Sequence, residues 1–179
     1  MKAARLAWLL LLIAGLVWIN ATRVRDATLL GPPGQRPPSP QVGFPAPDFS
    51  LSNLDGQSVR LADWRGQPLV LNFWATWCPP CRAEMPALQA AAQAFADRGV
   101  RVLGVNQAED PNPVVGFMQT LGLDFPVLLD RDAAVSQLYR VRSLPTTFFI
   151  DREGVIREIV IGGPMSQALL TSKIESLLK

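Results

Sequence analysis

The stretch that decides the fold is Phe73-Trp-Ala-Thr-Trp-Cys-Pro-Pro-Cys-Arg-Ala-Glu-Met-Pro86, in which the two cysteines of the chain, Cys78 and Cys81, stand three positions apart. The largely apolar run from Pro68 to Trp74 comes directly before them and predicts a buried strand. The Ala-rich run from Pro79 to Arg98 follows and predicts a helix. The cysteine pair is therefore expected where a buried strand passes into a helix.

This placement favours redox chemistry of the two thiols. The thiolate is the reactive form of cysteine, and the N–H groups and positive dipole end of a helix amino terminus stabilise it. Proline suits the first helical turn because it has no N–H to leave unsatisfied. The spacing lets the two sulfurs meet across one turn. We assign Cys78 as the attacking thiol and Cys81, one turn into the helix and shielded, as the thiol that resolves the mixed disulfide.

Composition excludes several other classes of protein. The chain has 179 residues, enough for one domain and a tail, and 49% of them are hydrophobic. It contains no histidine, which removes Cys–His and Ser–His–Asp nucleophile systems and every His-ligated metal site. Two cysteines cannot build a four-cysteine zinc site. The net charge of +2 is spread along the chain without a run of Lys or Arg, so we expect no nucleic-acid partner.

Residues 1–22 predict a membrane anchor or a secretory signal. Lys2 and Arg5 come before an uncharged stretch, Leu6 to Thr22, whose length is at the short end of the roughly 17–25 residues that span a bilayer. We favour an uncleaved single-pass anchor over a cleaved signal, and a buried core helix is the remaining alternative. Both an uncleaved anchor and a cleaved signal would place the catalytic domain on the extracytoplasmic, periplasmic side of the cell membrane.

Residues 23–43 are rich in Pro and Gly and predict a stiff, extended linker, followed by a folded domain at 44–179. In that domain strands and helices alternate, which predicts a mixed α/β sheet with helices on its faces. Asp55-Gly56 separates strand patterns at 49–54 and 58–61 and indicates a β-hairpin. The other predicted elements are strands at 100–105, 125–129, 146–151 and 155–161 and helices at 113–121, 132–139 and 166–178, the last capped by Ser166.

The segment from Phe73 to Pro86 resembles the active-site segment of the thioredoxin-like TlpA/ResA family, relatives of the cytochrome c maturation thiol reductases. The resemblance extends from about Gly43 to the carboxyl end. Its motifs are specific for the family and much less so for any one substrate. Further matches are Pro47-Asp-Phe-Ser-Leu51, Asp55-Gly56, Leu144-Pro-Thr-Thr-Phe-Phe-Ile-Asp151 and Gly154.

The resemblance implies an α/β thioredoxin-like fold with an added N-terminal β-hairpin and a central insertion at about 110–140, preceded by one N-terminal transmembrane helix. It implies an extracytoplasmic thiol–disulfide oxidoreductase, more a reductase than an oxidase, that acts in cytochrome c maturation or oxidase metal-site assembly without a cofactor. The implied partners are disulfide-containing exported proteins, a membrane thiol-electron donor, and the membrane itself through the N-terminal helix.

The resemblance also assigns site residues. Pro145 matches the family's cis-proline, which lies against the cysteines and presents backbone groups to a bound substrate strand. Glu84 stands where some relatives carry an acid that relays a proton or raises a thiol pKa, although a solvated helix glutamate is the alternative. Asn72 replaces the buried acid of ordinary thioredoxins and cannot take a proton. The expected substrate-binding residues are Trp77, Pro79, Leu144 and Pro145.

Two other functions fit the same fold class. A peroxiredoxin-like thiol peroxidase carries Thr three residues before its reactive cysteine, where this chain has Ala75, with Thr76 one residue closer. A Cu(I) metallochaperone would have to bind copper through the two thiolates or Met85, since there is no histidine. We expect no resident metal site. A static structural disulfide is a weak alternative because so small a loop constrains the unfolded chain little.

Overall fold

The computed structural model describes residues 15, 18 and 36–179. Apart from residues 15 and 18, the predicted anchor at 1–22 lies outside these residues, as does the predicted linker up to residue 35. No helix among the described residues is long and apolar enough to cross a bilayer. The chain divides into two compact units, Met1–Arg36 and Pro37–Lys179, and the second contains the predicted catalytic domain.

The second unit begins at Pro37, ahead of residue 44, where the sequence places the start of the domain. Two backbone hydrogen bonds account for the difference. The N–H of Ser39 donates to the carbonyl of Pro45 at 3.0 Å, and the N–H of Gly43 donates to the carbonyl of Ile156 at 2.8 Å. The last residues of the predicted linker are therefore bound to the domain.

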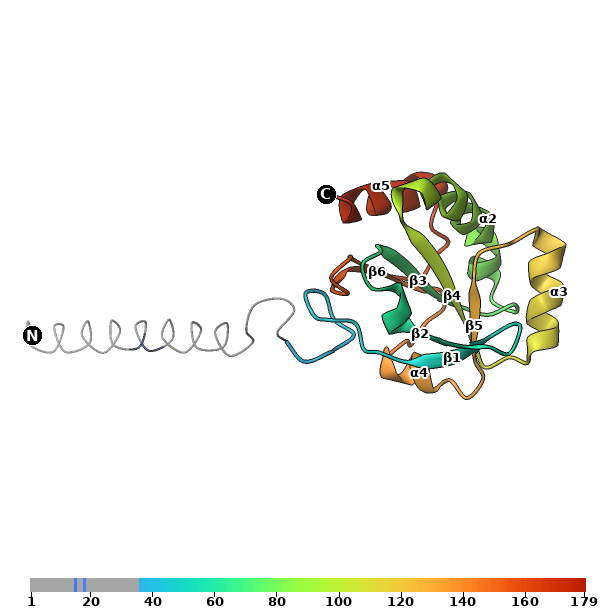
Figure 1. The fold of residues 1–179 in the computed structure, drawn as a ribbon, viewed down its shortest axis with the longest axis horizontal. Coiled ribbons are helices and arrows are strands. Elements are labelled where there is room, and N and C mark those ends of the chain that lie inside the picture. Colours follow the sequence, from blue (N-terminus) through green and yellow to red (C-terminus); the bar gives the residue numbers. More distant parts are fainter. Residues whose placement is uncertain (1–14, 16–17, 19–35) are drawn as a thin grey trace, which may run out of the picture. The chain divides into compact units, whose positions relative to one another are not determined.

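A single seven-stranded sheet runs through the domain in the order β2-β1-β5-β4-β3-β6-β7 (Figure 1). Strands β3, β4 and β5 are parallel, whereas β6 pairs antiparallel with β3 and β1 pairs antiparallel with β5. The strands are β1 Ser50–Asn53, β2 Ser58–Arg60, β3 Leu69–Trp74, β4 Arg101–Gln107, β5 Val127–Asp130, β6 Thr146–Ile150 and β7 Ile156–Ile161. The mixed sheet predicted from the alternation of elements is confirmed.

Four described α-helices and two 3-10 helices complete the domain. They are α2 Pro79–Ala94, α3 Pro111–Leu121, α4 Ala134–Leu138, α5 Gln167–Leu177, η1 Leu61–Trp64 and η2 Ala96–Arg98. Ser166 caps α5 as predicted, since its side chain accepts the N–H of Leu169. The helix expected to reach Arg98 ends at Ala94, because Phe95 leaves helical geometry and its carbonyl accepts the N–H of Val100 at 3.2 Å.

Strand β3 shows how the sheet separates two apolar cores. All six of its residues are buried, as expected for a strand covered on both faces. Val70 and Trp74 belong to the core that includes residues of α2, α3 and α5, and Leu69, Leu71 and Phe73 belong to the core on the opposite face. Figure 1 shows α2 and α5 together on one side of the sheet. Side chains alternate along a strand, so Asn72 faces α2 together with Val70 and Trp74.

The two predicted additions pair with each other. The hairpin β1–β2 turns at Asn53, whose side-chain oxygen accepts the N–H groups of Asp55 and Gln57 at 3.0 and 2.8 Å. The segment at 110–140 forms α3, β5 and α4. Strand β5 of that segment pairs with β1, with Ser52 opposite Leu129. The hairpin therefore extends the sheet by attaching to the inserted strand.

Candidate active site

The cysteine pair lies at the junction between β3 and α2, where the sequence predicts it. Cys78 is the N-cap residue of α2, with an extended backbone (φ −85°, ψ 109°). The two sulfurs form a disulfide across a Cα–Cα distance of 5.3 Å. Cys78 keeps 3% of its surface exposed and Cys81 none. Cys78 is thus the outer cysteine of the pair.

The first turn of α2 directs its free backbone donor at Cys78. Pro79 and Pro80 occupy the first two helical positions and have no N–H. The N–H of Cys81 is the next donor along the helix, and it points at the sulfur of Cys78 at 3.3 Å. When the disulfide opens, a thiolate at Cys78 has this N–H and the positive helix end beside it, which stabilises the charged form.

A groove of about 340 Å³ opens beside Cys78. It contains three of the four predicted substrate-binding residues, and Trp77 is the most prominent of them because its side chain is 68% exposed. The groove therefore provides a partly apolar surface next to the outer sulfur. Its lining residues are Trp77, Cys78, Pro79, Pro80, Gln107, Val141, Arg142, Ser143 and Leu144.

The fourth predicted residue, Pro145, is buried behind the groove rather than lining it. The Leu144–Pro145 peptide bond is cis, as the resemblance implied. However, the carbonyl of Pro145 accepts the N–H of Gly162 at 2.8 Å. Leu144 is the residue of this pair that reaches the groove, and the role of Pro145 in offering backbone groups to a substrate strand stays a prediction.

Glu84 is buried, so the alternative of a solvated helix glutamate is wrong. Only 1% of its surface is exposed. One carboxyl oxygen accepts the side-chain amide of Asn72 at 2.8 Å, and the other accepts the N–H of Met165 at 3.0 Å. The same amide group of Asn72 also donates to the hydroxyl of Thr147 at 2.8 Å. The two residues that the sequence singled out separately, Asn72 and Glu84, are in direct contact.

Burial raises the pKa of the Glu84 carboxyl above its ordinary value, and the hydrogen bonds from Met165 and Asn72 oppose that rise without cancelling it. Its hydrogen-bond partners are uncharged, and no neighbouring charge contributes to the rise. Glu84 lies one helical turn after Cys81, on the inner side of the pair. It can therefore hold a proton at a higher pH than an exposed glutamate does.

Gly163 is a residue that sequence reasoning missed. A Cβ atom at this position would lie 2.8 Å from Cγ of Pro145 and 3.0 Å from a carboxyl oxygen of Glu84. Only glycine allows the backbone to approach both groups so closely. The doublet Gly162-Gly163 before Pro164 is the signal that could have indicated a close backbone approach.

Glu109 is the second residue that the sequence did not reveal. It follows β4, and one of its carboxyl oxygens accepts the N–H of Thr76 and the side-chain amide of Asn106, both at 2.7 Å. The other oxygen accepts the hydroxyl of Thr76. The carboxyl ends of parallel strands meet at one edge of a sheet, so an acid just after β4 could have been expected near the loop after β3.

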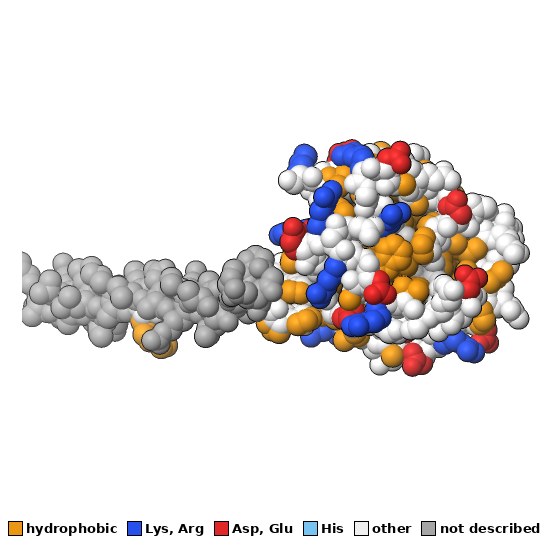
Figure 2. Space-filling model, viewed as in Figure 1, with side chains coloured by type: hydrophobic (Ala, Val, Ile, Leu, Met, Phe, Trp, Pro, Cys, Tyr) orange, Lys and Arg blue, Asp and Glu red, His pale blue; other side chains and the backbone are white. Residues whose placement is uncertain are grey.

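Charged side chains of both signs are interspersed over the face of the domain seen in Figure 2, with hydrophobic side chains gathered near its centre. Within the described part of the chain, no three His, Cys, Asp or Glu side chains come together as a metal site would require.

Known proteins resemble this chain in both sequence and structure. A profile of the AhpC/TSA family matches residues 42–159. Thiol-disulfide oxidoreductase ResA of Geobacillus thermodenitrificans is 42% identical over 136 residues, which cover 76% of this chain and 78% of that protein. A thiol:disulfide interchange protein of the thioredoxin family from Chlorobium tepidum has a TM-score of 0.67 and 30% identity, and the match covers 81% of this chain and 99% of that one.

A further solved structure is a secreted Mycobacterium tuberculosis disulfide oxidoreductase homologous to E. coli DsbE, with a TM-score of 0.66, 31% identity and coverage of 72% of this chain and 96% of that one. These similarities confirm the thioredoxin-like α/β fold. They also match the chemistry of a disulfide at a helix amino terminus. The chain therefore belongs to the AhpC/TSA family, and it is a thiol–disulfide oxidoreductase of the ResA/DsbE type.

Proposed function

We propose that this oxidoreductase works outside the cytoplasm, held at the cell membrane by residues 1–22, and that it reduces disulfides in exported proteins. The observation that carries its exchange chemistry is the Cys78–Cys81 disulfide at the start of α2, beside an open groove. The apolar, positively flanked residues 1–22 support the location, as does the secreted M. tuberculosis relative.

In the reducing direction the reaction has two exchange steps. The Cys78 thiolate attacks one sulfur of the client disulfide, forming a mixed disulfide while the other client sulfur leaves and takes up a proton. The Cys81 thiol then loses its proton and attacks the sulfur of Cys78, which closes the Cys78–Cys81 disulfide and releases the second client thiol. Two electrons and two protons pass to the client, and a membrane thiol-electron donor returns them to the pair.

Glu84 is suited to accept the proton that Cys81 loses. It lies one turn beyond Cys81 on the same helix, and its raised pKa lets the carboxyl exchange a proton closer to neutral pH. Asn72 cannot serve in this role because an amide does not titrate in this range. Glu84 is therefore a titratable group on the inner side of the pair, and its hydrogen-bond partners, Asn72 and Met165, do not titrate.

The reduction potential of the Cys78–Cys81 pair tests the direction of the reaction. We expect a value near or below that of thioredoxin, about −270 mV. A potential close to that of a strong oxidant such as DsbA, about −120 mV, would contradict the reductase assignment and leave the exchange chemistry intact. The measurement requires only equilibration of the purified protein with a glutathione or dithiothreitol redox buffer.

The proposed clients are the haem-site cysteines of apocytochrome c or the metal-site cysteines of respiratory oxidases. Both carry cysteine pairs that must be reduced before a haem or metal is attached. Deleting the gene should impair c-type haem attachment or oxidase assembly. If both processes continue unchanged in the deletion strain, both client proposals fail.

The peroxidase and copper-carrier alternatives receive less support. The hydroxyl of Thr76 is bound by Glu109 instead of facing an open site beside Cys78. Met85 is fully buried in the core, where it is poorly placed to bind incoming copper. Peroxide consumption at a rate comparable to insulin reduction, or Cu(I) uptake by the reduced protein against a weak chelator, would reverse this ranking.

A further inference from the structure

The exposed indole of Trp77 needs a support that its own contacts do not supply. With 68% of its surface exposed, Trp77 packs little against the domain, yet it forms one wall of the groove beside Cys78. Its position therefore depends on the backbone that carries it. That backbone begins at Thr76, the half-buried residue directly before it.

Side chains from the segment after β4 and from α2 bind every polar group of Thr76. Glu109, after β4, accepts both the N–H and the hydroxyl of Thr76. Arg82, in the first turns of α2, donates to the carbonyl of Thr76 at 3.1 Å. Arg82 is itself placed over the ring of Phe117 in α3, 5.1 Å from its centroid. The acidic side chain of Glu109 thus binds the N–H and hydroxyl of Thr76, and the basic side chain of Arg82 binds its carbonyl.

The bonds to Glu109 are charge-assisted, which makes them about twice as strong as neutral ones. Asn106, buried at the end of β4, fixes the Glu109 carboxyl in turn through its side-chain amide at 2.7 Å. This chain of contacts connects the rigid sheet to the loop that presents Trp77. We infer that Glu109, acting with Arg82, is a positioning residue that sets the Trp77 wall of the groove for a protein client.

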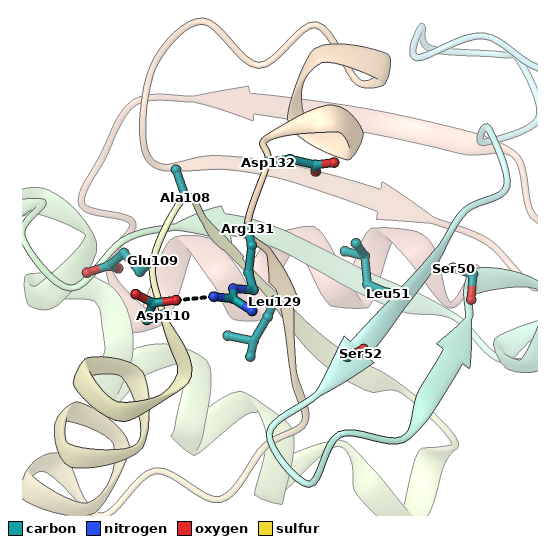
Figure 3. Close-up of a pocket in the computed structure, with 9 residues that line it drawn as sticks. All are labelled: Ser50, Leu51, Ser52, Ala108, Glu109, Asp110, Leu129, Arg131 and Asp132. Carbon is teal, nitrogen blue, oxygen red and sulfur yellow. Dashed lines mark hydrogen bonds and ion pairs between the residues drawn. The ribbon is translucent and has the colours of Figure 1, made fainter.

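The neighbouring carboxylate supplies a matched comparison. Figure 3 shows Asp110 turned toward Arg131, with which it forms an ion pair, while the side chain of Glu109 is directed away from Arg131. Glu109, Asp110 and Arg131 all line a hollow of about 610 Å³ that does not include the cysteines, but of the two acids it is Glu109 that binds Thr76. Asp110→Asn therefore removes a negative charge next to Glu109 but leaves the hydrogen bonds of Thr76 to Glu109 in place.

The inference rests on the proposal that the groove beside Cys78 binds the client, and a double-mutant cycle separates the two. Trp77→Ala, Glu109→Gln, the double variant and the control Asp110→Asn are assayed as full chains for reduction of insulin and of a small aromatic disulfide. Because Glu109 acts through Trp77, we expect Glu109→Gln to raise KM for insulin about fivefold to tenfold while kcat changes less than about twofold.

The same substitution should have little further effect in the Trp77→Ala background, and Asp110→Asn should behave as the unchanged protein. With the small disulfide, Asp110→Asn should keep the rate within about twofold, and the loss caused by Glu109→Gln should be smaller than its loss with insulin, because a small substrate contacts less of the Trp77 wall. Thr76→Ser, which keeps the hydroxyl, should retain activity, whereas Thr76→Val should reproduce part of the Glu109→Gln effect.

Three results decide the matter. If Trp77→Ala raises KM but Glu109→Gln does not, the proposal that the groove binds the client is supported and the positioning role of Glu109 is wrong. Additive effects of the two substitutions would mean that Glu109 acts by general destabilisation, which also overturns the inference. If Trp77→Ala leaves KM unchanged, the groove proposal fails first. Thr76→Val keeps the test valid should Glu109→Gln fold poorly.

Discussion

Two glutamates flank the cysteine pair, and they occupy opposite environments. Glu84, on the inner side, is 1% exposed and contacts uncharged groups of Asn72 and Met165. Glu109, on the outer side, is half-buried and holds the loop that carries Trp77. The inner glutamate can change its protonation because burial raises its pKa. The Glu109 carboxyl accepts hydrogen bonds from Thr76 and Asn106. The inner side therefore suits proton transfer, and the outer side suits client recognition.

This contrast predicts that the inner side tolerates added charge far less than the surface does. Asn72→Asp replaces the amide that donates to Glu84 with a second carboxyl group at 2.8 Å. Two buried carboxyl groups at that distance cannot both ionise, so we expect a loss of about 3 kcal/mol in the free energy of unfolding at neutral pH. The loss should shrink at acid pH, where one carboxyl takes a proton. Denaturant unfolding at several pH values measures both effects.

The matched control is Asn53→Asp in the β1–β2 hairpin. The side-chain oxygen of Asn53 accepts two backbone N–H groups, a role that Asp retains, and the substitution removes only an exposed hydrogen bond from the Asn53 amide to the side chain of Gln57 at 3.2 Å. We expect its effect to stay within about 0.5 kcal/mol. Equal losses from the two substitutions would show that Asn72 does not occupy a special environment.

Glu84→Gln tests the raised pKa directly. Because burial lifts the folded-state pKa of Glu84 above the ordinary value of 4.5, the folded protein holds this proton more tightly than the unfolded chain does. The resulting stability is fully present below pH 4.5 and is lost as pH rises through the raised pKa. The difference in unfolding free energy, wild type minus Glu84→Gln, should therefore fall with rising pH and then level off. Folding increases the proton affinity of Glu84, and each tenfold increase should lower the difference in unfolding free energy by about 1.4 kcal/mol over the whole pH range.

Glu175→Gln provides a control of the opposite sign. The hydrogen bond from Arg98 lowers the pKa of the Glu175 carboxyl, so its stabilising contribution is present above the ordinary pKa and is lost as pH falls. The wild-type-minus-variant difference should then rise with pH. A Glu84 difference with this same slope would refute the assigned direction of its pKa change.

Gly163→Ala should disturb the buried side of the pair at two points. The added Cβ would press on the ring of Pro145 and the carboxyl of Glu84 at 2.8 and 3.0 Å. We expect a loss of about 1–3 kcal/mol in stability from this overpacking. Gly116→Ala in α3 meets no atom within 4 Å, so it should be neutral or stabilising by about 0.5–1 kcal/mol. Thermal unfolding of the two variants compares a crowded with an open glycine.

Local patterns predicted most of the elements and the place of the cysteines. Asp55-Gly56 indicated the hairpin and Ser166 the cap of α5, because both depend on neighbouring residues. The pairing of β1 with β5 could not be predicted in this way, since Ser52 and Leu129 meet only through the tertiary fold. The contacts of Glu109 with Thr76 and of Gly163 with Glu84 share that origin.

Burial explains the other differences between the expected and the observed site. Glu84 has the sequence pattern of either a surface glutamate or an active-site acid, and only the packing of α2 against β3 reveals that its carboxyl is buried. Pro145 was matched correctly to a cis bond, but its carbonyl is taken by Gly162, a tertiary contact that no local pattern reveals.

The most direct measurement is the capture of mixed disulfides with exported proteins by two cysteine variants. If Cys78 attacks and Cys81 resolves, Cys81→Ser should accumulate covalent client complexes that a reductant releases, and mass spectrometry should identify the clients. Cys78→Ser should form none and should lose all turnover. Accumulation in Cys78→Ser and not in Cys81→Ser would contradict the account, because the outer position of Cys78 would then not determine which thiol attacks.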